Sequence, residues 1–312
     1  MNKEKIKKVI IDTDPGVDDA ACLVYALFDK SIDIKLITTV SGNISVEKNT
    51  RNMLHILDKF GVDIPVAKGC AKAMNRISPY AEHIHSVEGL GGYIPPVSVS
   101  RPLHELDAVE AMYKVLSEGD GDIEILLLGP QTNMGTLLQR HPDIIKKIPN
   151  IIFMGGCPYG IEGYPKHISF NISSDPEAFK IVLESGIPLT MVPSDLGRNK
   201  AHLDEEFVIE KIKNVNAVGN FIFQMYDKYW EPGYPDKRVA TNDTCAYIYF
   251  VAPELFTTQK VDMDVDLVEA PGKTIIEFKE DGKYDFVTGV NRKGFLDFLY
   301  TKLRDFDNFD LK

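Results

Sequence analysis

Short apolar runs alternate with longer amphipathic segments along the 312-residue chain. The short runs are rich in valine and isoleucine, and their nearly continuous apolar character indicates β-strands that are buried on both faces. The amphipathic segments between them predict helices. The predicted strands cover residues 8–12, 34–40, 64–69, 123–129, 151–156 and 187–193, and the predicted helices cover residues 18–30, 45–60, 105–118, 175–185, 204–230 and 292–306.

This alternation predicts a Rossmann-like α/β fold, in which a mostly parallel central sheet carries helices on both faces. Residues 262–269, 273–279 and 284–289 predict a later strand and a hairpin. The chain contains no Pro/Gly/Ser-rich linker, internal repeat or low-complexity tract. We therefore expect residues 1–312 to form a single domain, which is common for α/β enzymes of this length.

Polar or glycine-rich residues follow several of the predicted strands. Asp12 and Asp14 end the first strand, and Ser-Gly-Asn at 41–43 follows the second. Gly-Pro at 129–130 and Met-Gly-Gly at 154–156 end two strands further along the chain. Because ligands of such sheets bind beyond the carboxyl ends of the strands, we expect these clusters to contribute to one site.

The turn after the first strand carries a high density of negative charge. In the stretch IIDTDPGVDDA (residues 10–20), Asp12, Asp14, Asp18 and Asp19 fall where a strand passes into a helix. Capping of the helix N-terminus accounts for one or two of these carboxylates, which contribute about 0.3–1 kcal/mol each. It does not account for Asp12 and Asp14 facing them across a Pro-Gly turn, since like charges at close range repel. A hard cation, Ca²⁺ or Mg²⁺, offsets that repulsion, so the sequence predicts a metal site.

Composition and charge narrow the classes of function. With 44% hydrophobic and 26% charged residues, the chain is typical of soluble globular proteins. Its formal net charge of −11 disfavours nucleic acid and anionic membranes as partners. The basic N-terminus is not followed by a long apolar stretch, so we expect no signal peptide, no membrane span and a cytoplasmic location. The cysteines lack CxxC or histidine pairing and are expected to be reduced core thiols: Cys22, Cys70, Cys157 and Cys245.

One family that begins in a similar way does not fit. Haloacid-dehalogenase-type phosphatases also carry a DxD motif at the end of the first strand and use its first aspartate as nucleophile. Their pattern requires Thr or Val two residues after the second aspartate. Here Gly16 stands at that position, preceded by Pro15, so this interpretation fails.

A second family matches closely. The stretch DTDPGVDDA resembles the signature of the nucleoside hydrolases, which are calcium-dependent N-ribohydrolases. Further motifs occur in the order in which that family has them, and the resemblance spans roughly residues 7–255. These motifs are ITTVSGN (37–43), HSVEGLGG (85–92), LGPQTN (128–133), FMGG (153–156), FNISSDPEA (170–178) and NDTCA (242–246).

The resemblance implies a Ca²⁺ site built from oxygen ligands. Its ligands would be Asp14, Asp19, the backbone carbonyl of Leu128, and Asp243, with open positions for water and sugar hydroxyls. Asp14 would also be the general base that takes a proton from the attacking water. Asp12 would orient the loop that carries these ligands.

The resemblance also implies the contacts to the sugar. Asp18 and Asn43 would hold the ribose 2′-hydroxyl, Asn171 and Asp243 would meet the 3′-hydroxyl, and Met154 would lie near the ribose. The reaction would be attack of water on the anomeric carbon through a transition state that resembles an oxocarbenium ion. Carboxylate and amide oxygens near the ribose, among them that of Asn171, would stabilise the developing positive charge.

The residues around the nucleobase are less clearly assigned. His85 matches the flap histidine of the family, and His83 is a weaker candidate that fits an exposed position. Trp230 and Tyr234 follow the end of a predicted helix, where stacking on the base and plain packing are equally open. Three residues at helical spacing before them are expected in the core: Phe221, Met225 and Tyr229.

The chain departs from the family at three positions. Many members have histidine before the last metal aspartate and use it as the leaving-group acid, but this chain has Asn242, which cannot donate a proton as an acid. The glutamate that meets the ribose 5′-hydroxyl is Ser169 here, and the glycine after the flap histidine is Ser86. The metal and diol half of the site is retained, whereas the leaving-group and 5′ regions differ.

These residues predict an enzyme that hydrolyses the N-glycosidic bond of ribonucleosides with Ca²⁺, giving free base and ribose. Two alternatives stay open: a calcium-dependent ribose- or nucleoside-binding protein with little turnover, and a hydrolase of a 5′-modified ribosyl substrate. The expected partner is a small nucleoside. The resemblance also implies a homo-oligomer, a dimer or tetramer.

Overall fold

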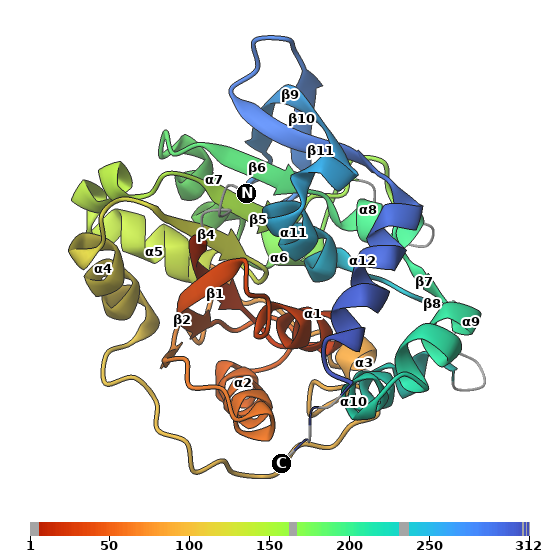
Figure 1. The fold of residues 1–312 in the computed structure, drawn as a ribbon. Coiled ribbons are helices and arrows are strands. Elements are labelled where there is room, and N and C mark those ends of the chain that lie inside the picture. The colour runs from red at the N-terminus through yellow and green to blue at the C-terminus, as the bar shows by residue number, and fades with distance from the viewer. Residues whose placement is uncertain (1–5, 162–166, 231–236, 308, 310, 312) are drawn as a thin grey trace.

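A nine-stranded sheet forms the centre of the molecule. The computed structural model describes residues 6–161, 167–230, 237–307, 309 and 311 (Figure 1). The strand order in the sheet is β10-β9-β11-β6-β5-β4-β1-β2-β3. Its strands are β1 (Lys7–Thr13), β2 (Ile32–Thr39), β3 (Val66–Lys68), β4 (Ile123–Leu127), β5 (Ile151–Met154), β6 (Leu189–Val192), β9 (Phe256–Val265), β10 (Thr274–Phe278) and β11 (Tyr284–Val290).

Strands β1 to β6 and β11 run parallel to their neighbours among themselves, as the apolar runs predict. Strand β9 pairs antiparallel with both β10 and β11, and these three strands project from one end of the molecule (Figure 1). The expected α/β class, with a mostly parallel sheet, is confirmed. The later strand and hairpin are also confirmed, although β9 begins at Phe256, earlier than the pattern predicts.

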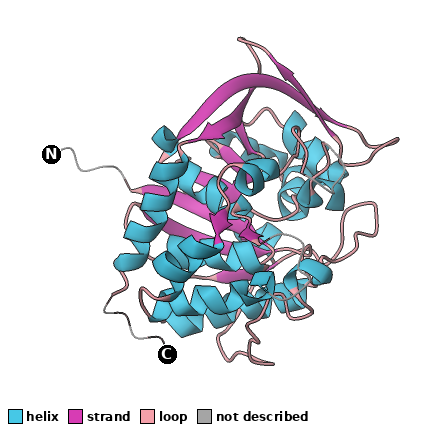
Figure 2. Ribbon diagram, turned by 90° about the vertical axis from the view of Figure 1, so that its right-hand side faces the viewer, coloured by secondary structure: helices cyan, strands magenta, loops and turns pink. Residues whose placement is uncertain are grey.

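Helices cover both faces of the sheet (Figure 2). Along β1, Val9 and Ile11 face one apolar cluster with α1, α2, α10, α11 and α12, whereas Ile10 faces the other with α4, α5 and α7. This alternation follows from the two-residue period of a strand. The helices are α1 (Val17–Ala26), α2 (Val46–Phe60), α3 (Glu82–His85), α4 (Ala108–Glu118), α5 (Thr132–Arg140), α6 (Phe170–Ser174), α7 (Pro176–Glu184), α8 (Ser194–Asn199), α9 (Glu205–Val208), α10 (Ala217–Tyr226), α11 (Asn242–Val251) and α12 (Arg292–Arg304).

Some elements differ from the prediction. The long helix expected over residues 204–230 is broken, because Asn216 caps a new helix by accepting a hydrogen bond from the Gly219 N–H. The short helices α3, α6 and α8 were not predicted, and neither were two longer ones, α5 and α11. Both begin at the polar motifs that supply the site, where Gln, Asn and Asp obscure the helical period.

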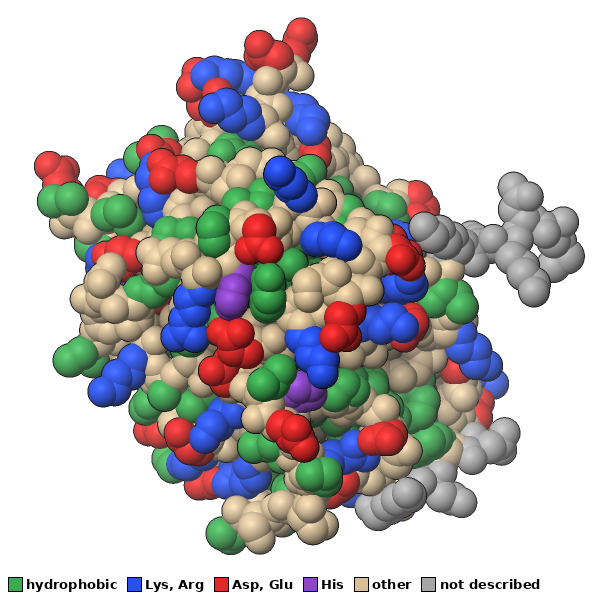
Figure 3. All heavy atoms as spheres, turned by 90° about the vertical axis from the view of Figure 1, so that its left-hand side faces the viewer, with side chains coloured by type: hydrophobic (Ala, Val, Ile, Leu, Met, Phe, Trp, Pro, Cys, Tyr) green, Lys and Arg blue, Asp and Glu red, His purple; other side chains and the backbone are tan. Residues whose placement is uncertain are grey.

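Charged side chains of both signs occur on the surface (Figure 3), and the cysteines are unpaired. On the face drawn in Figure 3, acidic and basic side chains are interspersed without a large basic patch. Within the described part of the chain, none of the helices has the length and apolar character needed to cross a membrane. All four cysteines are free thiols; Cys22, Cys157 and Cys245 are buried, and Cys70 is partly buried.

Candidate functional site

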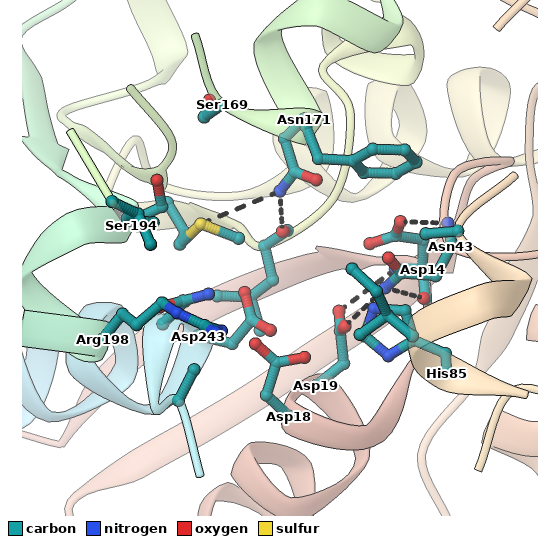
Figure 4. A pocket seen from close by; sticks show the side chains of 18 of the residues that line it. Asp14, Asp18, Asp19, Asn43, His85, Ser169, Asn171, Ser194, Arg198 and Asp243 are labelled. Carbon is teal, nitrogen blue, oxygen red and sulfur yellow. Dashed lines mark hydrogen bonds between the residues drawn. The ribbon is translucent and has the colours of Figure 1, made fainter. Parts of the chain in front are cut away.

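A cavity of about 150 Å³ opens at the carboxyl ends of the parallel strands (Figure 4). Strands β1, β4 and β5, the N-terminus of α11 and the segments around α3 and α6 supply its walls. The sequence therefore brings residues from across the chain to one place, as the positions of the polar clusters predict. Eleven predicted site residues line the cavity: Asp14, Asp18, Asp19, Asn43, His85, Leu128, Met154, Ser169, Asn171, Asn242 and Asp243.

Asp14 is completely buried at the floor of the cavity. Its Oδ2 accepts a hydrogen bond from the backbone N–H of Asn43 at 2.7 Å, while Oδ1 has no hydrogen-bond partner among the described residues. A Cβ on Gly42 would lie 2.0 Å from Oδ2, and one on Gly129 would lie 2.8 Å from Oδ1. Both glycines are therefore required for the backbone to close around this carboxylate.

Asp19 combines the capping role with a place at the site. It is the third residue of α1, and its carboxylate accepts hydrogen bonds from the Thr13 hydroxyl at 2.7 Å and from the Gly16 N–H at 3.2 Å. The Asn43 amide also donates to it, at 3.0 Å. The helix-capping interpretation is thus correct for Asp19, and the same contacts fix its orientation toward the cavity.

Asp18, Asp19 and Asp243 form a cluster of buried carboxylates whose ligand atoms all lie within 4.8 Å of one another. Neither oxygen of Asp243 has a hydrogen-bond partner among the described residues. Burial, followed by the charge of neighbouring carboxylates, raises the pKa of Asp14 and Asp243 well above the ordinary value, and the same causes raise the pKa of Asp18 to about 7. Such a group can hold a metal ion, which would stabilise the ionised carboxylates.

The cluster and the predicted ligand set overlap but are not identical. Asp19 and Asp243 belong to both. Asp18 is in the cluster although it was expected to bind the sugar, and Asp14 lies beyond Asp19, which accepts its backbone N–H at 3.4 Å. Asp14 and Asp243 both have buried oxygens without a hydrogen-bond partner among the described residues, and the carbonyl of Leu128, another lining residue, accepts the Asn171 amide.

Asp12 is not part of the cavity lining and forms hydrogen bonds to side chains of β2 and α5. Its Oδ1 accepts hydrogen bonds from the Thr38 hydroxyl at 2.5 Å and from the Asn133 amide at 2.7 Å. Asn133 also accepts the Cys70 N–H, which links Asp12 to the segment after β3. Burial raises the pKa of Asp12 to about 7. These contacts agree with the expected role in orienting the loop.

His85, at the end of α3, lies against the turn of the aspartate motif. Its Nδ1 accepts a hydrogen bond from the Val17 N–H at 3.0 Å, and the residue lines the cavity. A Cβ on Gly16 would lie 2.6 Å from Nδ1, which explains why glycine stands there. The next residue, Ser86, has φ 69° and ψ 166°, a conformation that is essentially restricted to glycine.

The opposite wall is formed around α6. The Asn171 amide donates to the carbonyl of Leu128 and contacts Met154 Sδ at 4.0 Å. The Ser169 hydroxyl accepts the Gly156 N–H at 2.7 Å, and Ser169 is the residue that precedes α6. Ser169 thus lines the cavity as a neutral group whose oxygen already has one partner.

Some residues that line the cavity were not predicted from the sequence as site residues. Ser194 and Arg198 of α8 and Tyr229 line the cavity, although Tyr229 was expected only in the core, which it also contacts. Ser194 could have been predicted from its position, because it lies just after β6, at the carboxyl edge of the sheet where ligands bind. Trp230 is not part of the cavity lining and packs against the core, while Tyr234 lies outside the described residues.

Comparison with known proteins gives one consistent answer. Residues 9–297 match the family model described as inosine-uridine preferring nucleoside hydrolase. The non-specific ribonucleoside hydrolase RihC of Salmonella paratyphi B is 35% identical over 273 residues, which cover 87% of this chain and 88% of that protein.

Solved structures agree. The purine-preferring ribonucleoside hydrolase from Gardnerella vaginalis has a TM-score of 0.88 at 27% identity and covers 97% of this chain and 100% of its own. The plant nucleoside hydrolase PpNRh1 has a TM-score of 0.86 at 26% identity, with 96% of this chain and 99% of its own covered. The fold is therefore shared over nearly the whole chain.

Proposed function

We propose that this chain, which belongs to the inosine-uridine preferring nucleoside hydrolase family and is an N-glycosyl hydrolase of ribonucleosides, depends on Ca²⁺ for that reaction. The observation that carries the proposal is that carboxylate oxygens of Asp14 and Asp243 are buried without a hydrogen-bond partner in the described part of the chain. A buried carboxylate that lacks a hydrogen bond is costly unless a cation meets it. The clustered ligand atoms of Asp18, Asp19 and Asp243 are all carboxylate oxygens, which suits a hard ion.

The proposed ligands are Asp14, Asp19, the carbonyl of Leu128, and Asp243. Bound Ca²⁺ would supply positive charge that favours ionisation of a water molecule and attracts ribose hydroxyl oxygens. Ca²⁺ is preferred to Mg²⁺ because it accepts irregular sets of ligands, whereas Mg²⁺ demands near-octahedral geometry.

Asp14 is the proposed general base. Its Oδ2 is held by the Asn43 N–H, so Oδ1 is the atom that can take a proton from the attacking water. Gly42 and Gly129 lie so close to this carboxylate that a Cβ on either residue would clash with it. A positioned base of this kind contributes about 10²–10⁴-fold in rate.

The sugar contacts stay as the resemblance implies. Asp18 and Asn43 would hold the 2′-hydroxyl, Asn171 and Asp243 would meet the 3′-hydroxyl, and Met154 would lie near the ribose. Asn171 cannot turn freely, because its amide nitrogen donates to the Leu128 carbonyl, so its oxygen is left for the sugar. That oxygen and the carboxylates would stabilise the positive charge that develops on the ribose.

His85 is the proposed donor of a proton to the leaving base, because Asn242 carries an amide that cannot act as an acid. The Val17 N–H occupies Nδ1 and so directs the proton to Nε2. In this neutral form Nε2–H would donate a hydrogen bond to the leaving base, whereas transfer of the proton requires the imidazolium, in which Nδ1 is also protonated and no longer accepts the Val17 N–H.

A second candidate is hydrolysis of a 5′-modified ribosyl substrate. Ser169 favours it, since this residue is neutral and its oxygen is already engaged by the Gly156 N–H. Discrimination by a 5′-hydroxyl would then be weak, because loss of a hydrogen bond to a charged group costs about 1.5–3 kcal/mol.

We further propose that the protein is cytoplasmic and forms a homo-oligomer. The location follows the expectation from the sequence, and the homo-oligomer rests on the family resemblance. Light scattering of the purified chain tests the second. The function itself is tested by release of free ribose from a panel of nucleosides, with and without Ca²⁺. Binding without turnover would instead support the nucleoside-binding alternative.

A further inference from the structure

One segment of the chain brings His85 to the cavity. This flap segment, residues 74–88, contributes Ala81 and His85 to the cavity lining. Its middle is held by the backbone, because the Ala81 N–H donates to the Asn43 carbonyl at 2.9 Å. Before that contact the segment is open to solvent, and Ile77 is 99% exposed. The place of His85 in the cavity therefore also depends on how the two ends of the flap segment are fixed.

The first end of the flap segment is tied to the start of α7. Arg76 Nε donates to Glu177 Oε2 at 2.8 Å, and Nη2 donates to Oε1, so the guanidinium engages both carboxylate oxygens. Nearby, the Met74 N–H donates to Asp175 Oδ2 at 2.9 Å, and Asp175 caps α7 by accepting the Ala178 N–H. The hydrogen bonds from Arg76 lower the pKa of Glu177, which keeps this carboxylate ionised at neutral pH.

The second end of the flap segment is tied to α2. Arg51 Nη1 donates to Glu88 Oε2 at 2.6 Å, and Lys48 Nζ lies 3.3 Å from Glu88 Oε1. The Asn52 amide donates to the Glu88 carbonyl at 2.8 Å. Helices α2 and α7 pack against opposite faces of the sheet, since their buried residues belong to different apolar clusters. The flap segment thus passes from one face to the other, and each face holds one end.

The ion pairs at the two ends lie outside the cavity. None of the residues in the two arginine–glutamate pairs is part of the cavity lining: Arg76, Glu177, Arg51 and Glu88. Any effect of these pairs on the reaction therefore has to pass through the flap segment. Ion pairs at partly exposed positions add little to global stability. A planar bidentate pair, however, fixes the direction of the chain that carries it.

We propose that Arg76 and Glu177 are positioning residues, which hold the flap segment so that His85 meets the leaving base. Without this pair, one end of the segment loses its bidentate restraint, and His85 occupies its place beside the Val17 N–H for less of the time. A displacement of about 1 Å from the productive geometry costs about 10²-fold in rate. This proposal rests on the proposed function, in which His85 serves the leaving base.

A double-mutant cycle tests whether the pair acts through His85. Arg76→Met keeps much of the length of the side chain and removes its donors, and it should lower kcat/KM for uridine by about 10–100-fold. In the His85→Ala background the same substitution should change kcat/KM by less than about threefold, because the side chain that the pair positions is already gone. Glu177→Gln, which keeps the shape and removes the charge, should show the same pattern.

Further variants separate positioning from a general loss of structure. Arg76→Lys keeps the charge but not the planar fork, so it should retain more activity than Arg76→Met and less than the wild type. Lys180→Met is the matched control in α7, because its Nζ donates to Asp264 at 2.7 Å and its side chain is 28% exposed, against 27% for Arg76. It should leave kcat/KM for uridine unchanged. The rise in Tm on addition of Ca²⁺ should be the same in Arg76→Met as in the wild type, because the carboxylates of the site remain.

Equal losses from Arg76→Met in the two backgrounds would overturn the proposal, because the pair would then act on the whole site and not through His85. Unchanged activity of both Arg76→Met and Glu177→Gln, or full activity of His85→Ala, would also overturn it while leaving nucleoside hydrolysis intact. If Arg76→Met does not fold, Glu177→Gln carries the same cycle. Failure of the wild-type enzyme to release ribose from any nucleoside would instead refute the proposed function itself.

Discussion

The backbone N–H of Asn43 donates to Asp14 Oδ2 over 2.7 Å, while Asp14 Oδ1 lies buried without a hydrogen-bond partner among the described residues. One half of the carboxylate is thus fixed by the chain, and the other half is left for a ligand. Asp243 has two further oxygens in the same condition. The proposed cation and water molecule would complete the site, and the stability of the protein should reflect this.

A substitution at Asp243 should change Tm in opposite directions in the presence of Ca²⁺ and in the presence of a chelator. In the presence of Ca²⁺, Asp243→Asn should lower Tm, because saturating metal at 100 times its Kd stabilises a protein by about 2.7 kcal/mol and the variant loses that gain. In the presence of a chelator the same variant should have a higher Tm than the wild type, since it removes one of several repelling buried charges. Calorimetry of both proteins in both conditions measures this. The same sign of change in both conditions would argue against a metal at this carboxylate.

His85 should matter most for leaving groups that need a proton. His85→Ala should reduce kcat/KM for uridine by about 10²–10⁴-fold, because a positioned acid contributes that much. p-Nitrophenyl riboside, whose leaving group departs without protonation, should lose far less. His83→Ala, at an exposed position of the same helix, is the matched control. If the two substrates lose equally, His85 positions the Asp14 turn through the Val17 N–H and is not the acid.

Asp195 should make stability depend on pH. Burial raises its pKa from 3.8 to about 6, while its Oδ2 accepts the Tyr159 N–H at 2.7 Å. The folded protein therefore binds a proton that the unfolded chain has already lost, and the free energy of unfolding falls as pH rises from about 4 to about 6. The loss is at most about 3 kcal/mol. Asp195→Asn keeps the acceptor for Tyr159, so urea titrations across this range should show a flatter dependence than the wild type, and parallel curves would contradict this assignment.

Ser86 should carry backbone strain. Its φ of 69° with ψ of 166° costs a residue with a side chain about 1–3 kcal/mol, and glycine adopts it freely. Ser86→Gly should raise the free energy of unfolding by about 1 kcal/mol after the entropy that glycine adds to the unfolded chain. Ser86→Ala keeps Cβ and should bring no such gain. Equal stability of the two variants would show that the conformation is not strained.

Much of the fold and of the carboxylate site could be predicted because their signals are local. Continuous apolar runs identified β1 to β6, and four aspartates at a strand–helix turn required an explanation that capping alone did not provide. The order of the motifs along the chain then identified Asn171 and Asp243 as site residues, although both are distant in sequence from that turn.

Other features could not be read from local patterns. Arg198 follows β6 in a segment without a motif, and only the contact of Gly197 with Asn242 brings it to the cavity. The break between α9 and α10 depends on the cap at Asn216, which a pattern of apolar residues does not reveal. The resemblance to the family marked Ser86 as a departure from glycine. Its positive φ, however, is seen only in the folded chain.

Asp14 and the proposed cation are the central elements of the proposed reaction. The most direct test is the release of ribose from uridine by chelator-treated wild-type enzyme, titrated with Ca²⁺ beside Asp14→Asn, whose side chain has the same shape and can still accept the Asn43 N–H. We expect wild-type activity to be lost with the chelator and restored by Ca²⁺, and Asp14→Asn to be slower by at least about 10³-fold at saturating Ca²⁺. Full activity of the wild type in chelator, or near-normal turnover by Asp14→Asn, would contradict it.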